Sequence, residues 1–269
     1  LPYLARSLHS LGADYAALDQ SEAALPPYEE AVKIRRELAT HDPETYKPEL
    51  AISLRNLGNR LNALGRHTNA LATSEEAVDI YRQLVERDPE TYLPDLAGSL
   101  HNLGLDFAAL DQTEAALLSY EEAAKIRRNL APHDPESYQP ELSATLNSLA
   151  CSLSTHGQQE AALTAAAEAI TIRRKLAEKN PDRFVPELAN VLHTTGEALF
   201  GLNRIEEAII AYKEAVTILN SHVSMFPEKF KTKHEQHITD LEKALRSTGR
   251  NDDEVSEIIE KLSASLEDS

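Results

Sequence analysis

A repeat of 46 residues constrains this chain more than any other feature of its sequence. The segment Glu-Glu-Ala-Val-Lys-Ile at residues 29–34 returns in closely related form at 75–80 and 121–126, and more weakly at 167–172 and 213–218. Two series of prolines and one series of aromatic residues keep the same spacing: Pro43, Pro89, Pro135, Pro181 and Pro227; Pro2, Pro48, Pro94, Pro140 and Pro186; and Tyr46, Tyr92, Tyr138, Phe184 and Phe230. A fixed period of this length predicts an array of stacked structural units.

The period divides the chain into five tandem units and a divergent remainder. The units are residues 1–46, 47–92, 93–138, 139–184 and 185–230. Residues 231–269 keep the apolar spacing of a sixth unit, but Glu254 and Lys261 replace the small alanines. The end of a stacked array needs a polar outer face to stay soluble, so we expect residues 231–269 to form a degenerate sixth unit that caps the C-terminal end.

Each unit is predicted to contain two helices, A and B. In the second unit, the leucines at positions 50, 54, 57, 61 and 64 recur every three or four residues, which places them on one face of helix A. Thr68 is expected to cap helix B, and Pro94 is expected in the first turn of the next helix A. Two further prolines, Pro26 and Pro27, fall inside the first helix B, where they are expected to kink or unwind its first turn.

The composition agrees with an all-α fold and excludes several classes of function. Aromatic residues are only 5% of the chain and tryptophan is absent, which favours helices over strands. A net charge of −17 argues against nucleic acid as a partner, because such binding depends on neutralising phosphates. No apolar run is long enough to cross a membrane, and the single Cys151 fits a reducing compartment, so a cytoplasmic location is expected.

The residues of the repeat resemble a known family. The first unit contains Leu8-x-x-Leu11-Gly12-x-x-Tyr15 and then Ala24-x-x-x-Tyr28-x-x-Ala31, a pattern similar to that of the tetratricopeptide repeat. The third unit matches with Leu100, Leu103, Gly104, Phe107, Ala116, Tyr120 and Ala123. The resemblance implies a right-handed α-solenoid, a superhelical array of antiparallel helix pairs. A HEAT or armadillo array has a similar period but lacks this spacing of glycine and alanine.

The units are 12 residues longer than the usual 34 of the family. Elongated units of this kind are similar to those of kinesin light chains and of arrays attached to bacterial or fungal signalling NTPases and caspase-like proteases. The sequence begins at Leu1 without an initiator methionine, so we expect a fragment of a longer chain with domains upstream. Two alternatives to a binding scaffold follow: a sensor or autoregulatory segment of a larger signalling protein, or a structural module for self-association.

The resemblance further implies that the A helices line a concave groove that binds a protein or an extended peptide. The residues predicted to face that groove include Arg6, His9, Arg55, Asn56, Asn59, His101, Asn102, Asn147 and His193. Asparagine side chains both donate and accept hydrogen bonds, so they can hold a peptide backbone regardless of its sequence.

A more specific resemblance is to the carboxylate clamp of chaperone-binding tetratricopeptide domains. Arg55, Asn59 and Asn102 match three positions of that clamp, but Ala144 and Ser148 occupy the two positions where further basic residues are needed. The match is therefore only partial. It predicts that an acidic peptide or a C-terminal carboxylate docks near Arg55.

Catalysis, cofactors and metals are not expected. The histidines of the first, third and fifth units are two units apart, and helices packed about 8–10 Å apart separate them by about 20 Å, too far to share a metal ion. His234 and His237 lack a third ligand and are expected at the surface. Cys151 and His156 lie about 140° apart around one helix, so they cannot form a nucleophile–base pair.

Overall fold

The computed structural model describes residues 1–264, which form twelve α-helices and no strand. The predicted all-α class is confirmed. The helices are α1 (Pro2–Ala17), α2 (Ser21–His41), α3 (Pro43–Ala63), α4 (His67–Val85), α5 (Pro89–Ala109), α6 (Thr113–Leu130), α7 (Pro135–Thr155), α8 (Gln159–Lys179), α9 (Pro181–Gly201), α10 (Ile205–Met225), α11 (Pro227–Ser247) and α12 (Asp252–Ala264). Odd-numbered helices are the predicted A helices, and even-numbered helices are the B helices. Within residues 1–264, no helix is both long and apolar enough to cross a membrane.

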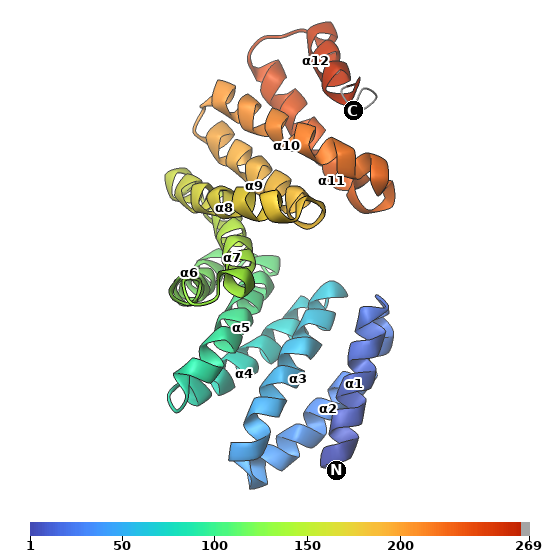
Figure 1. Cartoon of the computed structure of the whole chain (residues 1–269), viewed down its shortest axis with the longest axis vertical. Coiled ribbons are helices and arrows are strands. Elements are labelled where there is room, and N and C mark those ends of the chain that lie inside the picture. The colour runs from blue at the N-terminus through green and yellow to red at the C-terminus, as the bar shows by residue number, and fades with distance from the viewer. Residues whose placement is uncertain (265–269) are drawn as a thin grey trace. The chain divides into compact units, whose positions relative to one another are not determined.

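The chain divides into two compact halves, Leu1–Pro132 and His133–Ser269. We call them the N-terminal half, with α1–α6, and the C-terminal half, with α7–α12. Inside each half, every helix packs against the next one along the chain. Figure 1 shows the helices of each pair running antiparallel, joined by short turns. The predicted antiparallel helix pairs are therefore confirmed within each half.

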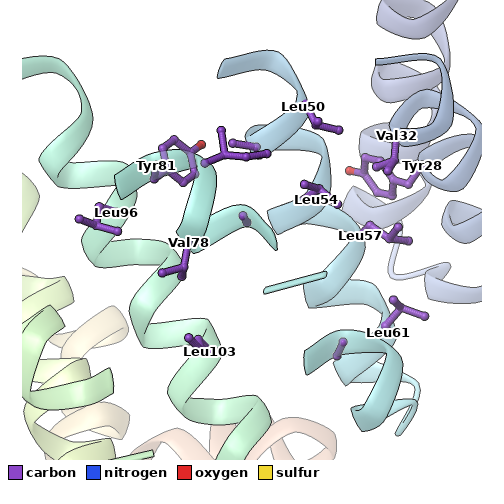
Figure 2. Packing of buried hydrophobic residues seen from close by; sticks show 14 of the residues in the cluster. Tyr28, Val32, Leu50, Leu54, Leu57, Leu61, Val78, Tyr81, Leu96 and Leu103 are labelled. Carbon is purple, nitrogen blue, oxygen red and sulfur yellow. The ribbon is translucent and has the colours of Figure 1, made fainter. Parts of the chain in front are cut away.

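The core of the N-terminal half is formed by the predicted apolar stripes. Leu50, Leu54, Leu57 and Leu61 of α3 are at most 5% exposed. They lie between the stripe of α2, which contributes Tyr28 and Val32, and that of α4, which contributes Val78 and Tyr81 (Figure 2). Because α3 buries leucines against helices on both sides, neither neighbouring helix pair could bury its apolar surface alone.

Glycine allows a close approach of helices A and B in alternate units. A Cβ atom added to Gly104 would lie 2.6 Å from the ring of Tyr120, and one added to Gly196 would lie 2.5 Å from the ring of Tyr212. Gly12 has the same relation to Tyr28, at 2.9 Å. The ring of the B-helix tyrosine thus occupies the space that any larger A-helix residue would need.

The turn from helix A to helix B uses a left-handed residue in every unit. These residues recur every 46 positions, and they are Asp19, Gly65, Asp111, Gly157, Asn203 and Gly249. Their φ angles lie between 57° and 86°, a conformation that favours glycine and is tolerated by aspartate and asparagine. In the second unit, the amide of Arg66 then donates to the carbonyl of Leu61 at 2.8 Å, which closes the helix end.

Helix A of each following unit starts earlier in the sequence than predicted. Helix α5 starts at Pro89, so Pro94 lies inside the helix and not in its first turn. Asp88 caps α5 by accepting a hydrogen bond from the amide of Thr91 at 3.2 Å. The equivalent caps are Asp42, Asp134 and Asn180, whereas Phe226 provides no side-chain cap to α11. The aspartate cap decides the start because it bonds an amide that the helix cannot satisfy itself.

Two other local predictions are wrong. Helix α4 begins at His67 after Arg66, so Thr68 is not its cap. Helix α2 is continuous from Ser21 to His41, so Pro26 and Pro27 do not unwind its first turn. Both prolines lie past that turn and each removes one intrahelical hydrogen bond, while packing of the buried Tyr28 holds the helix in place.

The last helix pair packs on α10. Val255 of α12 is 1% exposed and joins a cluster with Leu241 and Leu245 of α11. The side chains of Glu254 and Lys261 are exposed, as expected for an outer face. Residues 265–269 of the predicted cap lie outside the described residues, and the capping role of this pair remains a prediction.

A pair of glycine substitutions tests the left-handed turns. We expect Gly157→Ala to destabilise the protein by about 1 kcal/mol, because alanine must adopt a φ of 79° there. Gly98→Ala is the matched control, since Gly98 is helical and an added Cβ would approach no atom closer than 3.5 Å. Urea unfolding should show no loss of stability for the control. Equal losses in both variants would contradict this account.

Candidate functional site

Predicted site residues of the N-terminal half contact one another across neighbouring A helices. The amide nitrogen Nδ2 of Asn102 on α5 donates to Oδ1 of Asn59 on α3 at 2.7 Å. His9 on α1 lies 3.1 Å from Oγ of Ser53 and 3.4 Å from Nδ2 of Asn56, both on α3. The three asparagines are half-buried and therefore keep part of their polar surface accessible.

The two arginines predicted on this surface, Arg6 and Arg55, differ in exposure and in how close a carboxylate partner lies. Arg55 already has a carboxylate partner, because its guanidinium donates to Oδ1 of Asp95 on α5 at 2.6 Å. The side chain of Arg6 is 71% exposed and lies 4.0 Å from a carboxylate oxygen of Glu49. The guanidinium of Arg55 keeps further N–H groups for a second carboxylate, but its side chain is only 26% exposed, whereas that of Arg6 is freely accessible.

The three repeated histidines pack on the tyrosines that fill the glycine positions. Ring centres are 5.4 Å apart for His9 and Tyr28, 5.7 Å for His101 and Tyr120, and 5.3 Å for His193 and Tyr212.

Burial lowers the pKa of His9, and it lowers the pKa of His101 to about 3, with a smaller contribution from the positive charge of Arg127. Because burial disfavours the charged form, His101 is a neutral packing group at physiological pH.

In the C-terminal half, His193 belongs to a cluster of titratable groups between α9 and α11. Its Nε2 lies 2.9 Å from Oδ2 of Asp240, its ring stacks on His237 at 4.3 Å, and its Nδ1 lies 3.7 Å from Glu197. Burial raises the pKa of Glu197, with a further increase from Asp240 that opposes the effect of His193. Burial also lowers the pKa of His237 to about 3, and the neighbouring His193, Lys233 and His234 lower it further.

The expectation that His234 and His237 lie at the surface is wrong. They are 8% and 3% exposed, and Nε2 of His234 lies 2.6 Å from Oδ1 of Asn220 on α10. Both residues lie on the face of α11 that packs inward, which their spacing of three residues allows but does not reveal. Within residues 1–264, no three histidine, cysteine, aspartate or glutamate side chains are arranged to hold a metal ion.

The remaining residues considered in the sequence analysis, Asn147 and Cys151, make fewer side-chain contacts. Asn147 has a buried carboxamide oxygen without a hydrogen-bond partner among the described residues, and Asn190 shares this property. Cys151 is a free cysteine. Desolvation, followed by the charge of Glu197, raises the pKa of its thiol, which makes the thiol a weaker nucleophile.

Sequence reasoning missed a set of buried arginines on the B helices. Arg35 is 5% exposed and pairs with Glu49 of the next A helix at 3.3 Å, and Arg173 is 4% exposed and pairs with Glu187. Burial lowers the pKa of Arg173 to about 10. Arg127, also buried, holds the same position of the repeat. The recurrence of arginine at this position of the repeat in the first, third and fourth units was the available signal.

A second set of ion pairs joins consecutive B helices on their exposed sides. Arginine and glutamate are 40 residues apart in each pair: Arg36 with Glu76 at 2.7 Å, Arg82 with Glu122 at 2.8 Å, and Arg174 with Glu214 at 2.6 Å. These side chains are about half exposed, so each pair contributes little stability. They mark the side of each half that faces away from the core.

Cavities occur near the bends, away from the predicted site. One of about 480 Å³ lies between α2, α3 and α4 and includes Lys47 and Ile80. Two of about 300 Å³ occupy equivalent positions, one beside Tyr92 and the other beside Phe184. None of the residues that line these cavities is a predicted site residue.

The buried arginines predict an asymmetric effect of substitution. Glu187→Ala should cost about 3 kcal/mol, because it leaves the guanidinium of Arg173 buried without its counter-ion. Arg173→Met should cost about 1 kcal/mol or less, since it removes the charge and Leu219 fills the same position in the next unit. Chemical unfolding of both variants measures the difference. A larger loss for Arg173→Met would show that the ion pair itself, and not its desolvation, dominates.

The buried histidines predict a loss of stability in acid. His237 has a pKa of about 3 in the folded chain and about 6.5 when unfolded. Below pH 6.5 the unfolded chain binds a proton that the folded chain does not, so stability falls as the pH falls towards 3. At pH 5.5 this costs about 1.4 kcal/mol relative to pH 7.5.

Urea unfolding at the two pH values tests this. The loss of stability between pH 7.5 and pH 5.5 should be about 1.4 kcal/mol smaller in His237→Phe than in the parent protein. It should be the same as in the parent in the control His41→Phe, which replaces an exposed histidine. An equal loss in the parent protein and in His237→Phe would contradict the prediction.

Comparison with solved structures shows a shared fold at low sequence identity. A putative kinesin light chain of P. anserina with nearly identical TPR-like repeats is 20% identical, with a TM-score of 0.62 over 84% of this chain and 98% of that chain. BtubC (BKLC) from P. vanneervenii is 17% identical, with a TM-score of 0.62 over 93% of each chain. Aspartyl phosphate phosphatase F from Bacillus subtilis is 16% identical, with a TM-score of 0.61 over 100% of this chain and 61% of that chain.

Family models agree with the fold. No curated protein matches the sequence. One model described as tetratricopeptide repeat matches residues 49–129, a second matches 4–43 and 142–182, and a third matches 189–219. Together these stretches cover more than two thirds of the chain. The chain therefore belongs to the tetratricopeptide repeat family.

Proposed function

We propose that this chain is a protein-binding scaffold that holds an extended peptide along the A helices of its N-terminal half. The observation that carries the proposal is the hydrogen bond from Nδ2 of Asn102 to Oδ1 of Asn59. This bond leaves Nδ2 of Asn59 as a donor and Oδ1 of Asn102 as an acceptor, with no other hydrogen-bond partner in residues 1–264. Both side chains are half-buried, so a ligand can reach these atoms.

A donor beside an acceptor matches the carbonyl and the amide of a peptide backbone. Such a contact does not depend on the side chains of the ligand, which fits recognition of an extended segment. Asn56 lies three residues before Asn59 on α3, so both face the same side of the helix. The nearby His9, at 3.4 Å, restricts the side chain of Asn56 and reduces the entropy that a bound peptide would cost.

Charge favours an acidic ligand only weakly. Arg6 is the accessible cation, while Arg55 is held by Asp95. A peptide carboxylate or a C-terminal carboxylate would therefore meet Arg6 first. Of the predicted residues in the C-terminal half, His193 is engaged by Asp240, and the unpartnered carboxamide oxygen of Asn147 is buried.

Self-association is a second candidate, supported by the exposed leucines of α1. Leu4, Leu11 and Leu18 are 51%, 43% and 68% exposed, whereas Leu50 and Leu57, the counterparts of the first two in α3, are buried against α2. Light scattering distinguishes the candidates. A mass that rises with concentration and returns to that of a monomer in Leu4→Glu would support pairing through α1.

Affinity capture with matched variants tests the proposed function. The double variant Asn59→Ala and Asn102→Ala should lose partners from a cell extract that the parent retains, while Asn129→Ala, which alters an exposed asparagine of α6, should retain them. For a partner peptide, we expect at least tenfold weaker binding to the double variant, or about 1.4 kcal/mol.

The mode of recognition is tested on the same peptide. Methylation of the backbone amides of the peptide should weaken binding at least tenfold, as the double variant does. Single alanine substitutions in the peptide should have smaller effects. Partners that bind the double variant and the parent equally would place the site elsewhere.

A further inference from the structure

Figure 1 shows the bend that joins α10 to α11. Its side chains differ from those of the other bends. Met225 and Phe226 are 56% and 53% exposed there. The four other bends carry a basic residue and a helix-capping residue at these two positions: His41 and Asp42, Arg87 and Asp88, His133 and Asp134, and Lys179 and Asn180. Two exposed apolar side chains have thus replaced two polar ones.

The fold does not explain why phenylalanine occupies position 226. In the other four bends the equivalent side chain accepts a hydrogen bond from the helix amide three residues later, at 3.2 Å. Phe226 makes no such bond. Because aspartate or asparagine at this position stabilises the helix, and because Phe226 buries only half of its surface, helix stability favours an aspartate or asparagine here.

Unpaired positive charge adjoins these apolar side chains. Lys229 and Lys233 are exposed and lie one turn apart on the same side of α11. No carboxylate of residues 1–262 lies within ion-pairing distance of either ammonium group, and Lys229 lies 5.1 Å from the ring centre of Phe230. Glu228 is the one acidic residue in the first turn of α11. The uncapped helix start adds a further positive potential. We call Met225, Phe226, Lys229 and Lys233 the bend patch.

We propose that the bend patch is a docking surface for an acidic peptide segment that carries a large apolar side chain. The apolar group covers Met225 and Phe226, and flanking carboxylates meet Lys229 and Lys233. Charge complementarity supports this occupant, since Lys229 and Lys233 are exposed cations without a carboxylate partner in residues 1–262. An anionic membrane is disfavoured because it is an extended surface that would also meet the acidic remainder of the chain, whereas a short peptide contacts only the patch. The bend patch shares no residue with the asparagine site proposed above.

A peptide selection with a stabilising variant tests the proposal. A random library of 12-residue peptides is selected on the intact chain and counter-selected on Phe226→Asp. That substitution introduces the helix cap that the other bends have. The thermal unfolding midpoint of the variant should therefore equal or exceed that of the parent chain, so a loss of binding would not result from unfolding. We expect the peptides recovered only on the intact chain to have a net negative charge and at least one large apolar residue.

Charge reversal then tests the lysines on one synthetic peptide from that selection. In fluorescence polarisation, Lys229→Glu with Lys233→Glu should weaken binding at least tenfold. Lys125→Glu with Lys175→Glu, which reverses two exposed lysines elsewhere, should change it less than twofold. Binding should also weaken as salt is raised, because exposed charges are screened.

Several results would overturn the inference. Equal recovery on Phe226→Asp, or recovered peptides that are basic or uncharged, would exclude the bend patch as their site. Sedimentation of the chain with phosphatidylserine–phosphatidylcholine vesicles, without any selected peptide, would assign the patch to a membrane instead. Peptides that depend on Asn59 and Asn102 but not on Phe226 would support the proposed function and reject this one.

Discussion

The close contact between helices A and B is the constraint on which the rest of the structure depends. At Gly104 and Gly196 the B-helix tyrosine ring fills the space that a Cβ atom would need, at 2.6 and 2.5 Å. The rings of Tyr120 and Tyr212 are at most 3% exposed. They also contact His101 and His193, which lie one turn before the two glycines on the A helices. The small residue therefore allows the short distance between the helices, and it brings the tyrosine ring within reach of the A-helix histidine.

What remains accessible on the A helices follows from that packing. His101 is half-buried against the ring of Tyr120, and burial lowers its pKa to about 3, while Asn59 and Asn102 are also half-buried and bond to each other at 2.7 Å. Buried arginines join two of the B helices to the next A helix, as Arg35 does with Glu49 and Arg173 with Glu187. These contacts restrain one A helix against the next, and a preorganised pair of carboxamides costs less entropy when a peptide binds.

The repeat also allows its exceptions to be recognised. Where four bends place a capping residue, the bend before α11 places Phe226, and where three units bury an arginine, the fifth has Leu219. Leu219 is fully buried, so packing explains it, but Phe226 is 53% exposed and packing does not. Comparison of equivalent positions within one chain thus separates residues that serve the fold from residues that need another explanation.

The sequence by itself determined the repeat, the helix pairs and the core, because apolar spacing and the glycine and alanine positions are local patterns that every unit repeats. It also identified the asparagines of the A helices. It failed for His234 and His237, which were expected at the surface. Only the tertiary structure decided their burial, which depends on how α11 packs against α10, and only the tertiary structure places Asp95, 40 residues away, beside Arg55. A spacing places a residue on one face of a helix, but only the neighbouring helix determines whether that face meets a ligand, a counter-ion or the core.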